Sequence, residues 1–288
     1  MLENLSFASR FSKRGREGAM QFNFRGIIAA LALCWGVIGC GENILEAVSN
    51  RSTDAAYLER ARIRLDAGDF AGAISAISAM SGPAQAEREA KNLLASAYAG
   101  RCGMTFFKLT ETLSDMTDNL FLELMRGYPG ATAIEVADCV AAETILNSFG
   151  GVSERTASEN LLMVLISFAK IGTILSKDAD GDADGVVDGT FDHCTTSTDD
   201  DVKQIVTGLG NLLVSLPAAG SSLGGSSAND IATLCGSLPA QQNFCQVQKI
   251  DDVTADHILA MRGLVGTQDP PGLGSCAKDL INCVADCP

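Results

Sequence analysis

Residues 156–175 read TASENLLMVLISFAKIGTIL, and this run predicts a helix at the centre of the protein. Thr156 and Glu159 have the spacing of a capping box, in which each side chain satisfies a backbone N–H at the start of a helix. The apolar residues that follow lie on nearly all sides of a helix, as in a core helix or a membrane span. Glu159, Ser167 and Lys170 leave too short an uninterrupted apolar stretch for a span, so we expect a central buried helix.

Amphipathic helices are predicted on both sides of this run. Residues 131–147 carry apolar side chains at helical spacing, and residues 202–213 carry a second such stripe. Thr198 is the expected N-cap of the second helix, because the aspartates at 199–201 suit the positive end of the helix dipole. Aromatic residues make up only 6% of the chain, and strand-like runs are few. The predicted fold class is therefore all-α, a helical bundle or a short α-solenoid over residues 53–216.

Helical hairpins are predicted at the start of this domain, between residues 53 and 118. A turn at residues 67–69 separates the first two helices, and Pro83 begins a third. The motif GDFxxAI at residues 68–74 resembles the turn and second-helix start of tetratricopeptide repeats, and LAxxY at residues 94–98 resembles the core of the family's first helix.

The hairpin segment also departs from the tetratricopeptide pattern. Arg60 and Arg64 stand where the family packs large apolar side chains, and Cys102 replaces a turn glycine. The resemblance implies divergent tetratricopeptide-like repeats, and a generic pair of α-hairpins is the alternative.

The charge of the chain restricts its partners. Thirty-five acidic residues against 21 basic ones give a formal net charge of −14. Such a chain is repelled by phosphate backbones, so we exclude nucleic acid as a partner. A basic protein surface or a cation is the expected counterpart.

The N-terminal segment predicts export and lipid attachment. Residues 26–39 are uncharged, a length that suits a signal peptide and is short of the roughly 20 apolar residues of a membrane span. The sequence VIGC at residues 37–40 resembles the lipobox of bacterial lipoproteins. The resemblance implies that residues 1–39 are a signal peptide, with a start at Met20 favoured by its compact basic segment, and that Cys40 becomes the lipidated N-terminus. An ordinary signal peptide or an anchor helix is the alternative.

A lipoprotein of this kind has an expected location. Gly41 follows Cys40, whereas an aspartate at that position commonly retains such lipoproteins in the inner membrane. The resemblance therefore implies a protein on the outer membrane that faces the periplasm, held there by palmitate-type acyl chains on Cys40. Residues 40–52 are the expected spacer between the lipid and the helical domain.

Besides the lipidated Cys40, eight cysteines remain in the mature chain. An even number in an exported protein predicts disulfides, and a metal cluster is the rival explanation, although the only close pair is Cys283-x-x-x-Cys287. Eight cysteines leave the pairing open, with Cys235–Cys245 favoured as a local loop. Residues 217–288 are thus predicted as a Gly/Ser loop and an irregular cysteine-rich tail, stapled onto the helical domain. The disulfide candidates are Cys102, Cys139, Cys194, Cys235, Cys245, Cys276, Cys283 and Cys287.

A calcium loop is predicted within residues 178–192. The sequence DGDADGVVD at residues 180–188 resembles the loops of EF-hands, dockerins and thrombospondin type 3 repeats. Alternating carboxylates supply the oxygens that Ca²⁺ prefers, and Gly185 permits the sharp turn. Phe191 stands at the twelfth position, where an EF-hand has a bidentate glutamate. Asp192, the next residue, is therefore considered as a substitute ligand. A solvated acidic loop is the alternative. The expected ligands are Asp180, Asp182, Asp184, the Val186 carbonyl, Asp188 and Asp192.

Catalytic motifs are sparse. Residues 220–224 spell G-x-S-x-G around Ser222, but a nucleophile elbow needs a strand before the serine and a helix after it. His193, beside Asp192 and Cys194, is either a metal ligand or incidental. We therefore expect a non-enzymatic lipoprotein that binds or scaffolds a protein partner in the cell envelope. The alternatives are an accessory subunit of an envelope transport or outer-membrane assembly system and, less favoured, a serine hydrolase using Ser222.

Overall fold

The computed structural model describes residues 52–104, 119–219, 235–236, 238–268, 271–276, 278 and 280–287. Within these residues the regular structure is helical, and the β pairing is limited to one isolated bridge between Thr267 and Cys276. The all-α class is thereby confirmed. Three predicted features lie outside the described residues, namely the signal peptide with Cys40, the end of the hairpin segment at residues 105–118, and the G-x-S-x-G segment with Ser222.

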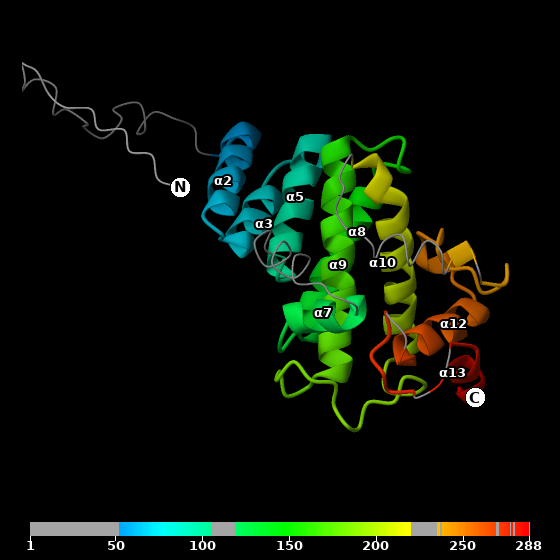
Figure 1. The fold of residues 1–288 in the computed structure, drawn as a ribbon. Helices are drawn as coiled ribbons and strands as arrows, with labels where there is room; N and C mark the ends of the chain where they lie inside the picture. Colours follow the sequence, from blue (N-terminus) through cyan, green and yellow to red (C-terminus); the bar gives the residue numbers. More distant parts are fainter. Residues whose placement is uncertain are drawn as a thin grey trace, which may run out of the picture. The chain divides into compact units, whose positions relative to one another are not determined.

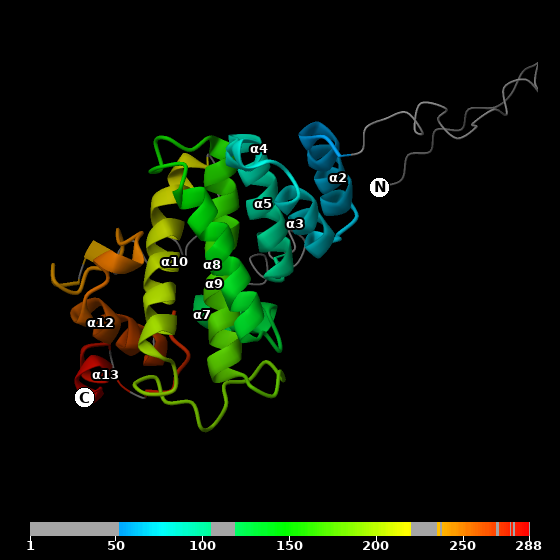
Figure 2. The same ribbon diagram turned by 180° about the vertical axis from the view of Figure 1, so that it is seen from behind.

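The described helices run from the blue to the red end of the chain in Figure 1, and Figure 2 shows the same arrangement from behind. Their bounds are α2 Asp54–Asp66, α3 Phe70–Ser78, α4 Gly82–Ala86, α5 Arg88–Arg101, α7 Leu120–Gly127, α8 Ala133–Asn147, α9 Ala157–Ala179, α10 Asp199–Ala218, the 3₁₀ helix η1 Ile250–Asp252, α12 Ala255–Gly266 and α13 Leu280–Asp286.

Helix α9 is the central element of the fold. It begins with the expected capping box between Thr156 and Glu159, and α7, α8 and α10 pack against it. Among the described helices, α9 is long and apolar enough to cross a membrane, but most of its residues are buried inside the protein. Its environment is that of a core helix, as the interruptions by Ser167 and Lys170 predicted.

Close helix packing depends on one glycine in α9. A Cβ atom added to Gly172 would lie 2.7 Å from the Leu124 carbonyl oxygen and 2.4 Å from Cδ2 of Tyr128. These distances are well inside van der Waals contact. The absence of a side chain at Gly172 therefore allows the end of α7 to approach α9.

Substituting Gly172 by Ala should separate these helices and lower the free energy of unfolding by about 1–3 kcal/mol, the usual range for overpacking. Urea denaturation measures this change. Gly82→Ala is the matched control, because a Cβ at Gly82 meets no atom within 4 Å, and it should leave the stability within about 0.5 kcal/mol of wild type. Equal stability of the two variants would show that the α7–α9 contact tolerates a methyl group.

The N-terminal hairpin forms largely as predicted. Gly68 adopts φ +73° in the turn between α2 and α3, a conformation that favours glycine. Asp69 caps α3 by accepting from the Gly72 N–H at 2.9 Å. The third helix differs from the prediction, because Glu87 is extended and divides the segment after Pro83 into the short α4 and the longer α5.

The arginines that depart from the tetratricopeptide pattern stay at the surface. Arg64 forms an ion pair with Asp69 across the turn, and the Arg60 guanidinium lies 5.1 Å from the centre of the Tyr57 ring. Between the helices, a separate small core gathers mostly small side chains. Its buried members are Ala61, Ala76, Ile77, Met80 and Ala90.

The eight cysteines that follow Cys40 in the chain are all paired. The disulfides are Cys102–Cys139, Cys194–Cys287, Cys235–Cys245 and Cys276–Cys283, with Cα–Cα distances of 5.1, 5.1, 5.9 and 6.0 Å. The favoured local pair Cys235–Cys245 agrees with the prediction. The first disulfide joins the end of α5 to α8, and the other three lie in or reach the C-terminal region. That region is stapled onto the helices as expected.

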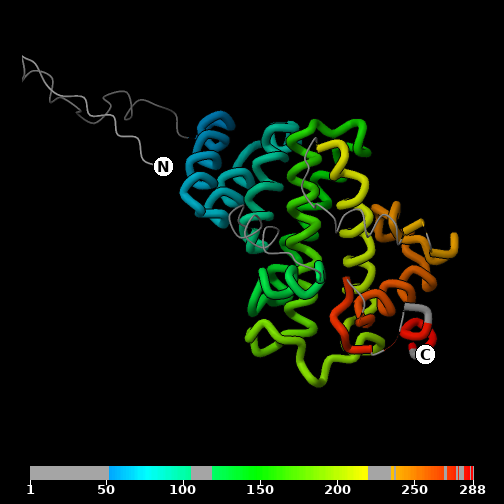
Figure 3. The backbone as a smooth tube through the Cα atoms, viewed as in Figure 1, coloured from blue at the N-terminus to red at the C-terminus, as the bar shows by residue number. Residues whose placement is uncertain are grey.

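The C-terminal region is more helical than predicted. Helix α12 has twelve residues, and its Met261 and Leu264 belong to the main core. Thr254 and His257 form its capping box, with the Thr254 N–H donating to Nδ1 of His257 at 3.2 Å. Histidine is not the usual partner in this motif, so the sequence pattern did not mark the helix start. Figure 3 shows α12 beside the lower part of α10, and α13 packs against α12.

Candidate metal centre

The predicted calcium loop joins the end of α9 to the segment before α10, at the lower end of both helices in Figure 3. Asp180 is the C-cap residue of α9. Ala183 and Gly185 adopt positive φ angles of 61° and 79°, which coil the chain tightly. The Asp184 N–H donates to Oδ1 of Asp182 at 3.3 Å, and the Val186 N–H donates to Oδ1 of Asp184 at 2.8 Å. Short aspartate side chains stabilise such turns by bonding to nearby backbone amides.

Three of the predicted ligands converge. Asp180, Asp182 and Asp184 each place a carboxylate oxygen within 4.8 Å of the other two. Asp180 is only 1% exposed, and the Gly185 N–H lies 3.2 Å from both of its oxygens. In the described part of the chain, no lysine or arginine forms an ion pair with these three aspartates. A buried carboxylate without a positive partner is strongly disfavoured, so the arrangement favours a bound cation.

The position of the cluster adds to this preference. The carbonyl end of a helix carries a partial negative charge, and Asp180 lies at the carbonyl end of the 23-residue helix α9. The carboxylates and the helix end therefore raise the local negative potential together. A cation at this point would relieve both sources of repulsion.

Asp188 and Val186 belong to the same loop. Oδ2 of Asp188 accepts from the Gly181 N–H at 2.9 Å, and the Asp188 N–H donates to the Ala179 carbonyl at 2.7 Å. Asp188 thus closes the loop back onto α9. The side chain of Val186 is 58% exposed, whereas Val187 packs against the main core.

Asp192 has a different role in the structure. Its carboxylate accepts from the Cys194 N–H at 2.8 Å and from the Thr195 hydroxyl at 2.9 Å. The backbone bond to Cys194 is the main reason that the pKa of Asp192 is lowered. Phe191, at the twelfth loop position, is buried in the core. The structure therefore places Asp192 in a turn of its own, and we leave it out of the ligand set.

Helix α7 holds the loop in place. Nε of Arg126 donates to the Gly185 carbonyl at 2.9 Å, and the same guanidinium pairs with Glu123 at 3.0 Å. These contacts join segments 59 residues apart. Because the loop is attached to α7 and α9, a bound ion would stabilise the contact between tertiary elements and not only a local turn.

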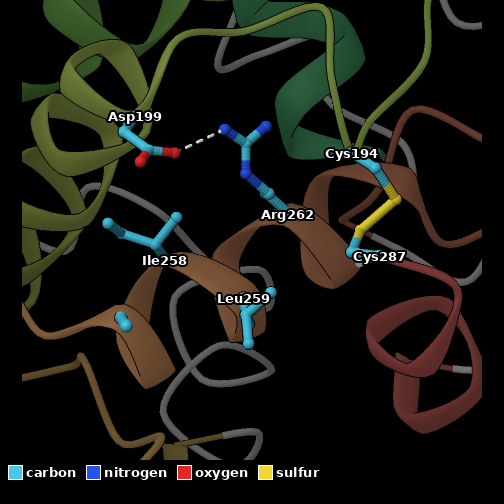
Figure 4. A pocket seen from close by; sticks show the side chains of 7 residues that line it. Cys194, Asp199, Ile258, Leu259, Arg262 and Cys287 are labelled. Carbon is cyan, nitrogen blue, oxygen red and sulfur yellow. Dashed lines mark hydrogen bonds and ion pairs between the residues drawn. A yellow bond between two sulfur atoms is a disulfide. The ribbon is translucent and has the colours of Figure 1, made fainter.

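A second feature was not apparent from the sequence. A cavity of about 270 Å³ lies near the start of α10, and Figure 4 shows Arg262 pointing to Asp199 at one side and a disulfide at the other. The residues around it come from segments that are far apart in the chain, so no short motif could reveal it. They are Cys194, Asp199, Ala255, Ile258, Leu259, Arg262 and Cys287.

The loop has the chemistry of a hard-cation site. Its convergent groups are carboxylate oxygens, which suit Ca²⁺, whereas zinc and copper prefer histidine and cysteine. Neither a protein-family model, nor a curated protein, nor a solved structure matches the chain.

Proposed function

We propose that this protein is a lipid-anchored periplasmic module that binds or scaffolds another envelope protein, and that a structural calcium ion stabilises its fold. The observation that carries the calcium assignment is the convergence of three carboxylates around the buried Asp180 at the end of α9. The proposed ligands are Asp180, Asp182, Asp184, Asp188 and the Val186 carbonyl.

The proposed ion has a structural role. Since no glutamate occupies the twelfth position, the expected dissociation constant is that of extracellular calcium modules, about 10⁻⁴–10⁻³ M. Such an affinity suits a compartment that is open to external calcium and is too weak for cytosolic signalling. The ion would neutralise Asp180 where α9 ends and support the loop that leads to α10.

Calcium should raise the melting temperature of the purified protein. At ten times the dissociation constant, binding to the folded state stabilises by about 1.4 kcal/mol, which corresponds to an increase of roughly 3–6 °C for a domain of this size. Differential scanning calorimetry with chelator and with millimolar calcium measures the shift. The double substitution of Asp182 and Asp184 by Asn should abolish it.

A matched variant separates ion binding from charge removal. Asp251 and Asp252 are exposed aspartates of η1, and their replacement by Asn removes the same charge at a distant part of the chain. This variant should keep the full calcium shift. An unchanged melting temperature of the wild type between chelator and several millimolar calcium would contradict the proposed ion.

The helical hairpins support the binding role. Helices α2, α3 and α5 pack side by side, and α2 exposes Ile63 to 61%. With a net charge of −14, a partner with a basic surface is expected. Crosslinking in intact cells followed by purification from membranes would identify the partner. A transport or outer-membrane assembly component would support the narrower alternative of an accessory subunit.

Lipid attachment at Cys40 is supported by the VIGC motif at residues 37–40. We expect the intact mass of the membrane-extracted protein to correspond to a chain that begins at Cys40 and carries a diacylglyceryl group. Cys40→Ala should leave the precursor uncleaved or release the protein from the membrane, because the acyl chains supply the membrane affinity. A mature N-terminus at another residue would refute the assignment.

A further inference from the structure

The disulfide Cys194–Cys287 differs from the other three in its exposure. Both of its cysteines are partly exposed and line the cavity near the start of α10 (Figure 4). In each of the other disulfides, at least one cysteine is buried. Exposed disulfides are the ones that exchange with external thiols, whereas buried ones are inert.

A histidine lies against this disulfide. Nε2 of His193 is 3.4 Å from Sγ of Cys194 and 3.4 Å from the carbonyl oxygen of Cys283. Because a carbonyl oxygen only accepts, the contact with Cys283 places a proton on Nε2. This N–H is shared between the Cys283 carbonyl oxygen and the Cys194 sulfur, which lie at the same distance.

The histidine ring is held firmly in this position. It is buried, and a Cβ atom added to Gly266 would lie 2.4 Å from its Cγ. Both sulfurs of the buried disulfide Cys276–Cys283 lie within 4.8 Å of a nitrogen of the same imidazole. Such close packing keeps Nε2 beside the Cys194 sulfur without a change of rotamer.

The cavity beside the disulfide combines a cation with an apolar wall. The Arg262 guanidinium is almost fully buried and donates to the His193 carbonyl at 3.3 Å, to the Ser197 carbonyl at 3.0 Å and to Oδ1 of Asp199 at 2.8 Å. Ile258 and Leu259 of α12 line the opening. Because Arg262 is paired with Asp199, the group that would stabilise a Cys194 thiolate is the His193 N–H, and the apolar side chains suit a peptide segment.

We propose that Cys194–Cys287 is an exchange site that oxidises the thiols of a dithiol substrate, namely an envelope polypeptide with an apolar side chain next to its cysteine. This role goes beyond the proposed calcium-stabilised scaffold and rests only on its proposed location in the cell envelope. His193 acts as a positioning residue that stabilises the departing Cys194 thiolate.

The exchange proceeds in two balanced steps. A substrate thiolate attacks Sγ of Cys287, the Cys194–Cys287 bond breaks, and Cys194 leaves with the electron pair as a thiolate that accepts from the His193 N–H. The second substrate thiolate then attacks the substrate sulfur of the mixed disulfide and releases Cys287. The substrate dithiol loses two electrons and two protons and becomes a disulfide. Cys194 and Cys287 together take up the two electrons and two protons and become thiols.

Timed reaction of the full-length protein with reduced glutathione tests this proposal. Acid quenching, alkylation and peptide mass spectrometry follow each disulfide. Cys194–Cys287 should open at least about tenfold faster than Cys235–Cys245, as expected for a leaving thiolate stabilised by one hydrogen bond, and glutathione should be found on Cys287. Cys235–Cys245 is the internal control, because Cys235 is partly exposed and glutathione can therefore reach this disulfide as well.

Variants at position 193 test the role of the histidine. His193→Phe keeps the ring volume but removes the donor, and it should slow the opening about tenfold. His193→Gln restores an N–H donor and should recover most of the rate. Equal opening rates for the two disulfides in wild type, glutathione on Cys194, or a wild-type rate in a folded His193→Phe variant would overturn the proposal.

Discussion

Replacing Glu143 by Gln should lower the free energy of unfolding by about 3–5 kcal/mol, the usual loss when one partner of a buried ion pair is removed. The side chain of Lys170 is 0% exposed and pairs with Glu143, whose side chain is 6% exposed. Nζ of Lys170 also donates to the Thr207 hydroxyl at 2.8 Å and to Oε1 of Gln204 at 3.2 Å. Glu143 in turn accepts from Asn211. The substitution would leave the ammonium group buried with neutral acceptors only.

The effect should depend on pH in a defined direction. Burial lowers the pKa of Lys170, and the charge of Glu143 opposes this shift. Without that charge the folded-state pKa falls further below that of the unfolded chain. The unfolded state then binds more protons between the two values, so stability rises with pH across that window. The deficit of Glu143→Gln should therefore shrink as the pH rises toward the ordinary lysine pKa of about 10.4.

Urea denaturation of single and double variants separates the effect of an unpaired buried charge on stability from the effect of altered packing. Lys170→Met alone leaves an uncompensated carboxylate and should also destabilise the fold. The double variant with Glu143→Gln and Lys170→Met removes both charges and should recover most of the loss, because a buried ion pair is often replaceable by apolar contacts. If Glu143→Gln alone stays within about 1 kcal/mol of wild type, the pair does not carry the expected stability.

The second large effect is expected at Glu159. This side chain is 5% exposed and accepts from two nitrogens of Arg88, from Nδ2 of Asn92 at 2.9 Å and from the Thr156 N–H at 2.7 Å. It therefore caps α9 and also joins α9 to α5. Glu159→Ala removes both functions and should destabilise by about 2–4 kcal/mol, the sum of a lost cap and a partly buried ion pair.

Glu135→Ala is the matched control for the cap alone. Glu135 occupies the same position in the capping box of α8, where its bonds go to Thr132. Its loss should destabilise by only about 1 kcal/mol. Similar losses for the two variants would show that the contact between Glu159 and Arg88 contributes little.

The stabilisation that comes from the charge of Glu159 should be lost in acid. Hydrogen bonds from Arg88 are the main cause of its lowered pKa, with those from Thr156 and Asn92 adding to it. A carboxylate with a lowered folded-state pKa stabilises the protein above its ordinary value, and this contribution is lost as the pH falls through the folded-state pKa. The difference between wild type and Glu159→Ala should therefore narrow below about pH 4.5. A gap that stays constant to about pH 2 would contradict the charge-based explanation.

The sequence alone determined the features that depend on neighbouring residues. The capping box of Thr156 and Glu159, the N-cap at Thr198 and the turn at Gly68 all appear in the structure where the pattern placed them. Each arises from bonds or torsion angles within a few residues, so local spacing is sufficient to predict it. The central position of α9 was also predictable, because a helix that is apolar on nearly all sides must be covered on all of them.

The tertiary structure alone decided the contacts between distant segments. Glu159 meets Arg88 across 71 positions, and Cys194 pairs with Cys287 across 93. Eight cysteines allow about 105 pairings, and beyond the local loop Cys235–Cys245 no sequence pattern selects among them. Asp192 could be a loop ligand by spacing, but the turn that follows it provides amide and hydroxyl donors that bind its carboxylate instead. The physical reason is that these contacts form only when the packed helices bring distant segments together. The spacing of residues along the sequence carries no information about which segments meet.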